Sequence, residues 1–351
     1  MRTVTQKPML TARKAFAILI LLALAGCRRP GESVVVYTSL DDVFSRPVLE
    51  AFAAETGIRV EPVFDVEAEK TTGLYQRLLA ERGRPRADVF WSSEAVRTAA
   101  LERAGVLEPW MPAGAASIPA PFRSPSGAWT GFAARARVII YHTGRVPPSE
   151  RPRSVRDLAD PRFRGEAAMA LPLHGTTAAH AGALRARLGK ERMEELFRAL
   201  AANEVKVVAG NSVVRDRVAS GEVKIGLTDT DDAHVAIRKG LPVGIVYPDQ
   251  EPLYPGLGEP LGTLLIPNTV ALIEGAPHPD EGKRLIEYLL RPETEAFLAR
   301  GDSAQIPVRK GIAPPPGLGM PENLVRMEVD WEKAREGLDA SVEFLRTLFV
   351  R

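Results

Sequence analysis

The chain has 351 residues, of which 26% are charged, and its formal net charge is +2. The 46 basic and 44 acidic side chains nearly balance, so the chain lacks the basic excess of nucleic-acid-binding proteins and no such partner is expected. The single cysteine excludes an intramolecular disulfide.

The first residues have the layout of an export signal. Four basic side chains precede an uncharged apolar stretch over 15–25, which is shorter than the roughly 20 residues of a membrane-spanning helix. Leu24-Ala25-Gly26-Cys27 follows and resembles the lipobox of bacterial lipoproteins, whose cysteine takes a diacylglycerol. We predict a lipoprotein signal peptide over 1–26, lipidation of Cys27 and a lipid-anchored tether over 27–32, with an ordinary secretory signal as the alternative. Removing the four basic residues of 1–26 changes the net charge from +2 to −2.

Strands and helices alternate after the tether. The apolar and β-branched runs predict strands at 34–37, 58–64 and 87–91, and the spacing of apolar residues predicts helices at 45–56, from 71 or 72 to about 83, and from about 95 to 105. This alternation indicates a doubly wound parallel sheet, in which ligands bind at the carboxyl ends of the strands.

Two long extended stretches, 131–141 and 262–273, have few breakers and are long enough to run from one lobe to another. Between and after them we predict strands at 167–171, 205–208, 223–227 and 243–247, and helices at 176–188, 191–201, 279–290, 293–300 and 321–349.

The predicted fold class is α/β, with two doubly wound lobes joined by a two-segment hinge. The N-terminal lobe is expected to comprise 33–136 plus 264–312, and the C-terminal lobe 137–263 plus 313–351. The cleft between two such lobes is the default binding site, and hinge closure around a ligand is the motion that this architecture allows.

Three turns between a strand and a helix carry hydroxyl groups. His174-Gly175-Thr176-Thr177 opens a helix, whose first amides and positive dipole end form a pocket for an anion. The alternative is that Thr176 only caps its own helix. We expect anion contacts from this turn and from the two turns of the first lobe: Gly175, Thr176, Thr177, Thr38, Ser39, Thr71 and Thr72.

The sequence Thr228-Asp229-Thr230-Asp231-Asp232 is the densest acidic cluster. Asp229, Asp231 and Asp232 are candidates to bind a cation or an ammonium group, although helix capping accounts for one or two such carboxylates, and salt bridges with arginine are a further alternative. Their spacing is not that of a calcium loop.

Arg135 alternates with Arg137 on the first extended stretch, so the two side chains point the same way. A solvated face is expected for one of them, and we assign Arg135 as the clamp for an anion. For Glu94, which follows a strand, helix capping and ligand contact are equally favoured.

No nucleophile with a suitable partner is found. The sequence has no GxSxG motif, no P-loop and no GxGxxG, and the five histidines lack the spacing of metal ligands. We therefore expect a protein that is not an enzyme and has no resident cofactor.

Several segments together resemble the extracellular solute-binding proteins of ABC importers, in the group that contains the periplasmic ferric-ion-binding proteins. They are VVVYTS, ETGIRV, KTTGL, ADVFWSSE, GFAARARVIIY, GLTDTDD, GTLLIPNTVALI and SAQIPVR. The resemblance covers nearly all of the mature chain and implies the type II periplasmic-binding-protein fold.

The resemblance carries over only part of the iron site. The family's glutamate matches Glu94 and its anion-holding loop matches 174–177, but its adjacent tyrosine pair falls on Asp231-Asp232, and its histidine falls on Leu40 or Asp41. The anion half of the site is retained and the phenolate half is missing. Glu94, Asp231 and Asp232 remain as oxygen ligands for a hard cation.

The expected function is that of a periplasmic lipoprotein that captures ferric iron with a synergistic anion, or a related anion, and delivers it to an ABC permease and its ATPase. An organic phosphate or phosphonate with an amine group is the alternative ligand. A lipoprotein that senses a ligand without transport is the alternative role. We expect a monomer that meets the membrane through the lipid on Cys27.

Overall fold

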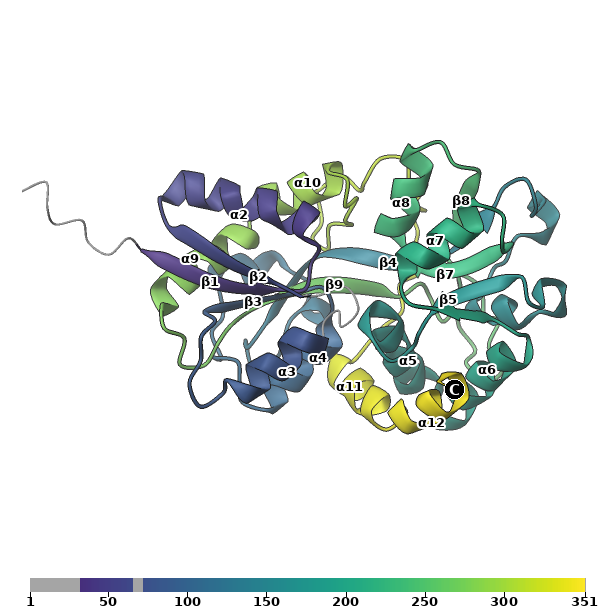
Figure 1. The fold of residues 1–351 in the computed structure, drawn as a ribbon, viewed down its shortest axis with the longest axis horizontal. Helices are drawn as coiled ribbons and strands as arrows, with labels where there is room; N and C mark the ends of the chain where they lie inside the picture. The colour runs from purple at the N-terminus through teal and green to yellow at the C-terminus, as the bar shows by residue number, and fades with distance from the viewer. Residues whose placement is uncertain (1–31, 66–71, 351) are drawn as a thin grey trace, which may run out of the picture.

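The computed structural model describes residues 32–65 and 72–350, and Figure 1 shows them as two α/β halves side by side. The signal peptide, Cys27 and Thr71 lie outside the described residues. No helix in the described part of the chain is long and apolar enough to cross a membrane.

The strands of the described residues form a mixed sheet in the order β2-β1-β3-β9-β4-β7-β5-β6, with β8 paired to β4. Pairing is parallel within β2-β1-β3 and within β6-β5-β7, and β4 and β9 are antiparallel to their neighbours. The bounds are β1 Ser33–Thr38, β2 Arg59–Phe64, β3 Val89–Ser92, β4 Thr130–His142, β5 Ala167–Ala170, β6 Lys206–Val208, β7 Ile225–Asp229, β8 Val243–Val246 and β9 Leu265–Leu272.

Helices cover both faces of each half. In the first half, α2, α9 and α10 lie on one face and α3 and α4 on the other; in the second half, α7 and α8 lie opposite α5, α6, α11 and α12 (Figure 1). The bounds are α2 Asp42–Thr56, α3 Thr72–Ala80, α4 Ala95–Arg103, α5 Gly175–Leu188, α6 Lys190–Ala202, α7 Asn211–Ala219, α8 Thr230–Arg238, α9 Pro279–Leu289, α10 Pro292–Arg300, α11 Trp331–Asp339 and α12 Val342–Phe349. Short 3₁₀ helices span Ala113–Ser117, Ala120–Phe122, Pro148–Glu150, Val155–Ala159 and Pro161–Phe163.

The doubly wound α/β fold predicted from the sequence is confirmed. β4 is the longest strand described, with 13 residues, because a run of small and β-branched residues, with two buried arginines, extends it across the molecule. It pairs with β9 as far as Ala136 and with β7 from Arg137 onward. The lobe boundaries given above stay a prediction.

The predicted helix over 321–349 is wrong in its first third. The backbone around Met327 runs beside Thr263, whose carbonyl accepts the amide of Met327, so this segment is not free to form helical hydrogen bonds. Helix α11 begins only after Asp330, which accepts the amides of Glu332 and Lys333.

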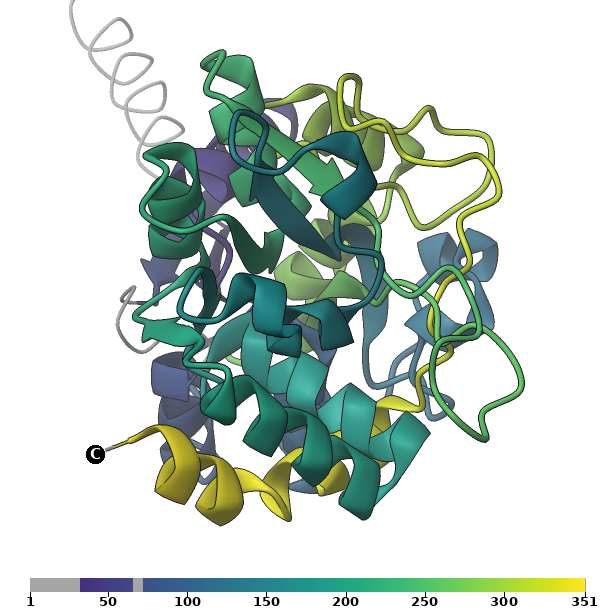
Figure 2. The same ribbon diagram turned by 90° about the vertical axis from the view of Figure 1, so that its right-hand side faces the viewer.

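The C-terminal helices α11 and α12 pack against the outer side of α5 and α6 in the second half. Figure 2 shows α11 and α12, in yellow, running along α5 and α6. Gly182 of α5 and Gly337 of α11 make this close crossing possible, because a Cβ at Gly182 would lie 2.3 Å from the carbonyl oxygen of Ala334. Trp331 also donates its indole N–H to the carbonyl of Pro121, which ties α11 to the first half.

Candidate functional site

A polar cleft of about 320 Å³ lies between the two halves. The first half and strand β4 contribute Asp41, Phe44, Ser93 and Arg135, whereas the starts of α5, α7 and α8 and the loops before them supply most of the remaining lining. The carboxyl ends of strands and the first turns of three helices therefore meet at one place, as expected for an α/β sheet.

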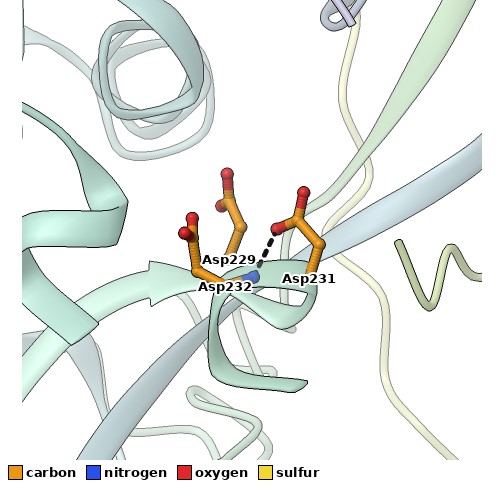
Figure 3. A group of neighbouring side chains, drawn as sticks. All are labelled: Asp229, Asp231 and Asp232. Carbon is orange, nitrogen blue, oxygen red and sulfur yellow. Dashed lines mark hydrogen bonds between the residues drawn. The ribbon is translucent and has the colours of Figure 1, made fainter. Parts of the chain in front are cut away.

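Asp229 ends β7, and Asp231 and Asp232 stand in the first turn of α8. Figure 3 shows their three carboxylates on the same side of the turn, and one oxygen of each lies within 4.8 Å of the others. The structure therefore brings together the three aspartates predicted to bind a cation, without Glu94. Each carboxylate also has an arginine nearby. Arg137 lies 2.7 Å from Asp229, Arg135 lies 3.7 Å from Asp231, and Arg215 lies 3.5 Å from Asp232.

Asp229 is held by a buried hydrogen-bond network. Its carboxylate accepts from Arg137, from the Thr176 hydroxyl at 2.6 Å and from the Asn211 amide at 2.9 Å. Burial alone would raise the pKa of this carboxyl, but Arg137 and Arg135 outweigh burial, so the pKa lies below its ordinary value. Asp229 is therefore charged and already fully engaged.

The burial of the Asp231 carboxylate is offset less by neighbouring positive charge than that of Asp229. Burial raises its pKa to about 6; Arg135 opposes the rise, while Asp229 and Asp41 add to it. Asp231 is buried at the edge of the cleft, and only 8% of the residue is accessible. Asp232 is half-buried and faces Arg215 of α7.

Arg135 joins the two halves across the cleft. Its guanidinium donates to the Ser93 carbonyl in the first half and lies near Asp231 of α8 in the second. Its Nε is buried and has no hydrogen-bond partner. Burial lowers the pKa of Arg135, but the four surrounding aspartates, Asp231 first, raise it above its ordinary value. Neither Arg135 nor Arg137 has the solvated face predicted for one of them, since both are buried.

The first turn of α5 lines the cleft with Gly175, Thr176 and Thr177. Gly175 has φ +56°, a left-handed conformation in which glycine has no steric penalty. The hydroxyls of Thr176 and Thr177 accept from Arg137, so they are turned inward. The first-turn amides, which have no acceptor within the helix, are what this turn offers to an anion.

The first-half residues that were predicted to contact an anion mostly make hydrogen bonds within the first half. Thr38 accepts the Leu40 amide, Ser39 pairs with Ser93, and neither Thr38 nor Ser39 lines the cleft. Thr72 reaches across to His174, with 3.4 Å between Oγ1 and Nδ1.

Glu94 does not line the cleft either. Its carboxylate accepts the amides of Val96 and Arg97 and so caps α4. Burial raises the pKa of this carboxyl, and Arg97 and the two amides oppose the rise. Of its two sequence interpretations, helix capping is the one that the geometry supports.

Helix α7 was not predicted from the sequence, and Asn211 and Arg215, which it carries, were missed with it. A signal was present, because Gly210-Asn211-Ser212 follows β6 as a polar turn between a strand and a helix, like the turns that were recognised. Asp41, considered only as the position of a family histidine, also lines the cleft.

The family model described as "Bacterial extracellular solute-binding protein" matches residues 85–336. Iron uptake protein A1 of Synechocystis sp. is 28% identical over 303 residues, which cover 81% of this chain and 80% of that protein. The iron-bound crystal structure of HitA from Pseudomonas aeruginosa has a TM-score of 0.79 and 23% identity, covering 91% of this chain and 100% of HitA. AfuA from Actinobacillus pleuropneumoniae, with fructose-6-phosphate bound, has a TM-score of 0.74 and 18% identity, covering 92% of this chain and 98% of AfuA.

Proposed function

The chain belongs to the bacterial extracellular solute-binding proteins, and from this premise we propose that its cleft takes up ferric iron together with a small anion. The observation that carries the proposal is the group of three carboxylates within 4.8 Å of one another, at the N-terminus of helix α8 and beside the first turn of α5. Hard carboxylate oxygens suit a hard cation, and helix amides suit an anion.

In this proposal the two ends of the ligand have separate holders. Asp231 and Asp232 bind the cation, because Asp229 is already engaged by Arg137, Thr176 and Asn211. The anion lies on the amides of Gly175–Thr177. It also compensates Arg135, whose partner Asp231 turns to the cation. Glu94 is left out of the cation site because it caps α4.

The protein's place in the cell is part of the proposal. We propose that it is a periplasmic lipoprotein anchored through Cys27, acts as a monomer and delivers its ligand to an ABC permease and ATPase. The family match and the likeness to a protein named for iron uptake support this role. Ligand that touches both halves would favour the closed cleft through its higher affinity for that state.

A second ligand class is favoured by a specific observation. Among the described residues that line the cleft none is a tyrosine, and each of the three aspartates has an arginine within 3.7 Å. A site of paired opposite charges also fits an organic phosphate or phosphonate that carries an amine, with its phosphorus group on α5 and its ammonium on Asp231 or Asp232.

Calorimetric titration distinguishes the two ligands. Protein lacking residues 1–27 is dialysed against a chelator and titrated with ferric citrate and with 2-aminoethylphosphonate. The iron proposal expects binding of ferric citrate, without the visible phenolate absorption of a tyrosine-ligated iron. Binding of 2-aminoethylphosphonate alone would replace it with the second candidate, and binding of neither would refute both.

The contribution of the carboxylates is tested in parallel. Asp231→Asn/Asp232→Asn removes two carboxylates from the cleft, and Glu336→Gln/Asp339→Asn removes two from the exposed surface of α11 as the matched control. We expect the first pair to abolish cation binding and the second to leave affinity unchanged. Equal affinity in both variants would show that the acidic cluster does not hold the ligand.

A further inference from the structure

Arg137 lies behind the cleft, fully buried on strand β4, and does not line the ligand space. One guanidinium group there reaches three elements. Nη1 lies 2.7 Å from Asp229 Oδ1 and 3.2 Å from both Thr176 Oγ1 and Asn211 Oδ1, and Nη2 lies 3.2 Å from Thr177 Oγ1. These acceptors belong to the first turn of α5, the first residue of α7 and the residue that precedes α8.

The acceptors are also bonded to one another. Thr176 donates to Asp229 at 2.6 Å, and the Asn211 amide donates to both Thr176 and Asp229 at 2.9 Å. The three helix starts that form one wall of the cleft therefore share a single polar centre. Removing Arg137 would leave the buried Asp229 carboxylate without its salt-bridge partner and the Thr177 hydroxyl without its donor.

We infer that Arg137 is a positioning residue for ligand binding: it fixes the starts of α5, α7 and α8 in the arrangement that presents backbone amides and carboxylates to the cleft. This inference rests on the proposed function for its consequence, which is ligand affinity. A planar guanidinium suits the task because it donates in several fixed directions at once, whereas a lysine ammonium is a single charged point. Groups that orient the ligands of a metal ion without touching the ion typically change affinity by about 10- to 100-fold, and we expect an effect of the same size here.

A merely structural role for Arg137 would be to neutralise Asp229. The two roles separate in the double variant Arg137→Met/Asp229→Asn, which removes both buried charges together and so avoids an unpaired one. Neutralisation alone predicts that this variant recovers wild-type stability and binds phosphate at least as tightly as the wild type, because Asp229→Asn removes from the cleft lining a carboxylate that repels an anion. Positioning predicts that stability in urea is recovered while affinity for inorganic phosphate, used as the probe, stays about 10- to 100-fold weaker.

The matched control is Arg145→Met/Glu166→Gln. It removes a second arginine–carboxylate pair of the same half, with a separation of 3.2 Å between Nη1 and Oε2, and neither residue lines the cleft. We expect it to bind phosphate as the wild type does. Arg137→Lys keeps the positive charge but loses the planar guanidinium with its several fixed donors. We expect it to bind phosphate as weakly as the double variant.

Hydrogen exchange measured without ligand gives an independent readout. Positioning predicts faster exchange in the double variant at the first turns of α5, α7 and α8, and unchanged exchange elsewhere in the same half. Wild-type affinity in the double variant, or unchanged exchange at these turns, would overturn the inference. If the wild type itself binds no phosphate, the anion part of the proposed function fails, and the exchange measurement decides the role of Arg137 by itself.

Discussion

Asp231→Asn should make the ligand-free protein more stable at neutral pH while removing a ligand from the proposed cation site. Burial raises the pKa of Asp231 from 3.8 to about 6, and this rise corresponds to about 3 kcal/mol of unfavourable free energy for the charged form in the folded state. The folded state therefore binds the proton more tightly than the unfolded state does. The contribution of Asp231 to stability is unfavourable at pH 7 and diminishes as the pH falls through about 6. Asparagine mimics the protonated carboxyl, so it removes most of this cost.

The assay is urea unfolding of chelator-treated protein at pH 7.5, 6 and 4.5, wild type against Asp231→Asn. We expect the variant to be more stable by up to about 3 kcal/mol at pH 7.5 and the difference to shrink toward pH 4.5. Comparing the two proteins cancels other groups, such as Asp249, whose burial raises its pKa to about 7. A variant that is less stable at pH 7.5, or a difference that does not depend on pH, would refute the reasoning. Such a cost is typical of binding residues that are held for function rather than for stability.

Three further predictions concern other parts of the chain. Gly182→Ala places a methyl group 2.3 Å from the Ala334 carbonyl oxygen and should lower the free energy of unfolding in urea by about 1–3 kcal/mol. Gly83→Ala, where a Cβ meets nothing within 4 Å, should change it little, and equal stabilities of the two variants would contradict the close crossing of α5 and α11. Glu94→Ala should lower the stability by about 1–2 kcal/mol through loss of the α4 cap and leave ligand affinity unchanged in calorimetry, so a large loss of affinity would return Glu94 to the ligand site. Cys27→Ser should abolish incorporation of labelled palmitate into the protein, and continued incorporation would exclude lipidation of Cys27.

The alternation of strands and helices was predictable because it depends on local patterns. The run Val34–Tyr37 forms the predicted strand, in which Val35 is half-buried and the other three residues are buried, and the extended stretch 131–141 forms the crossing strand β4. The acidic cluster and the first turn of α5 could be assigned to one site, because the carboxyl ends of the strands of an α/β sheet meet at the same edge.

The use of each polar side chain was decided by neighbours that are distant in sequence. Glu94 and Asp231 both stand at a helix start, yet Glu94 caps its helix and Asp231 faces Arg135 in the cleft. No local pattern distinguishes these two outcomes, because each depends on which groups the fold places within hydrogen-bond reach.

The sequence by itself therefore determined the fold class, most of the elements and the region of the proposed binding site, since hydrophobic periodicity and turn chemistry are local properties. Only the tertiary structure decided which charges meet. Arg137 and Asp229 are 92 residues apart, and the partner that sets the charge state and position of a buried group is chosen by packing rather than by the neighbouring residues in the chain.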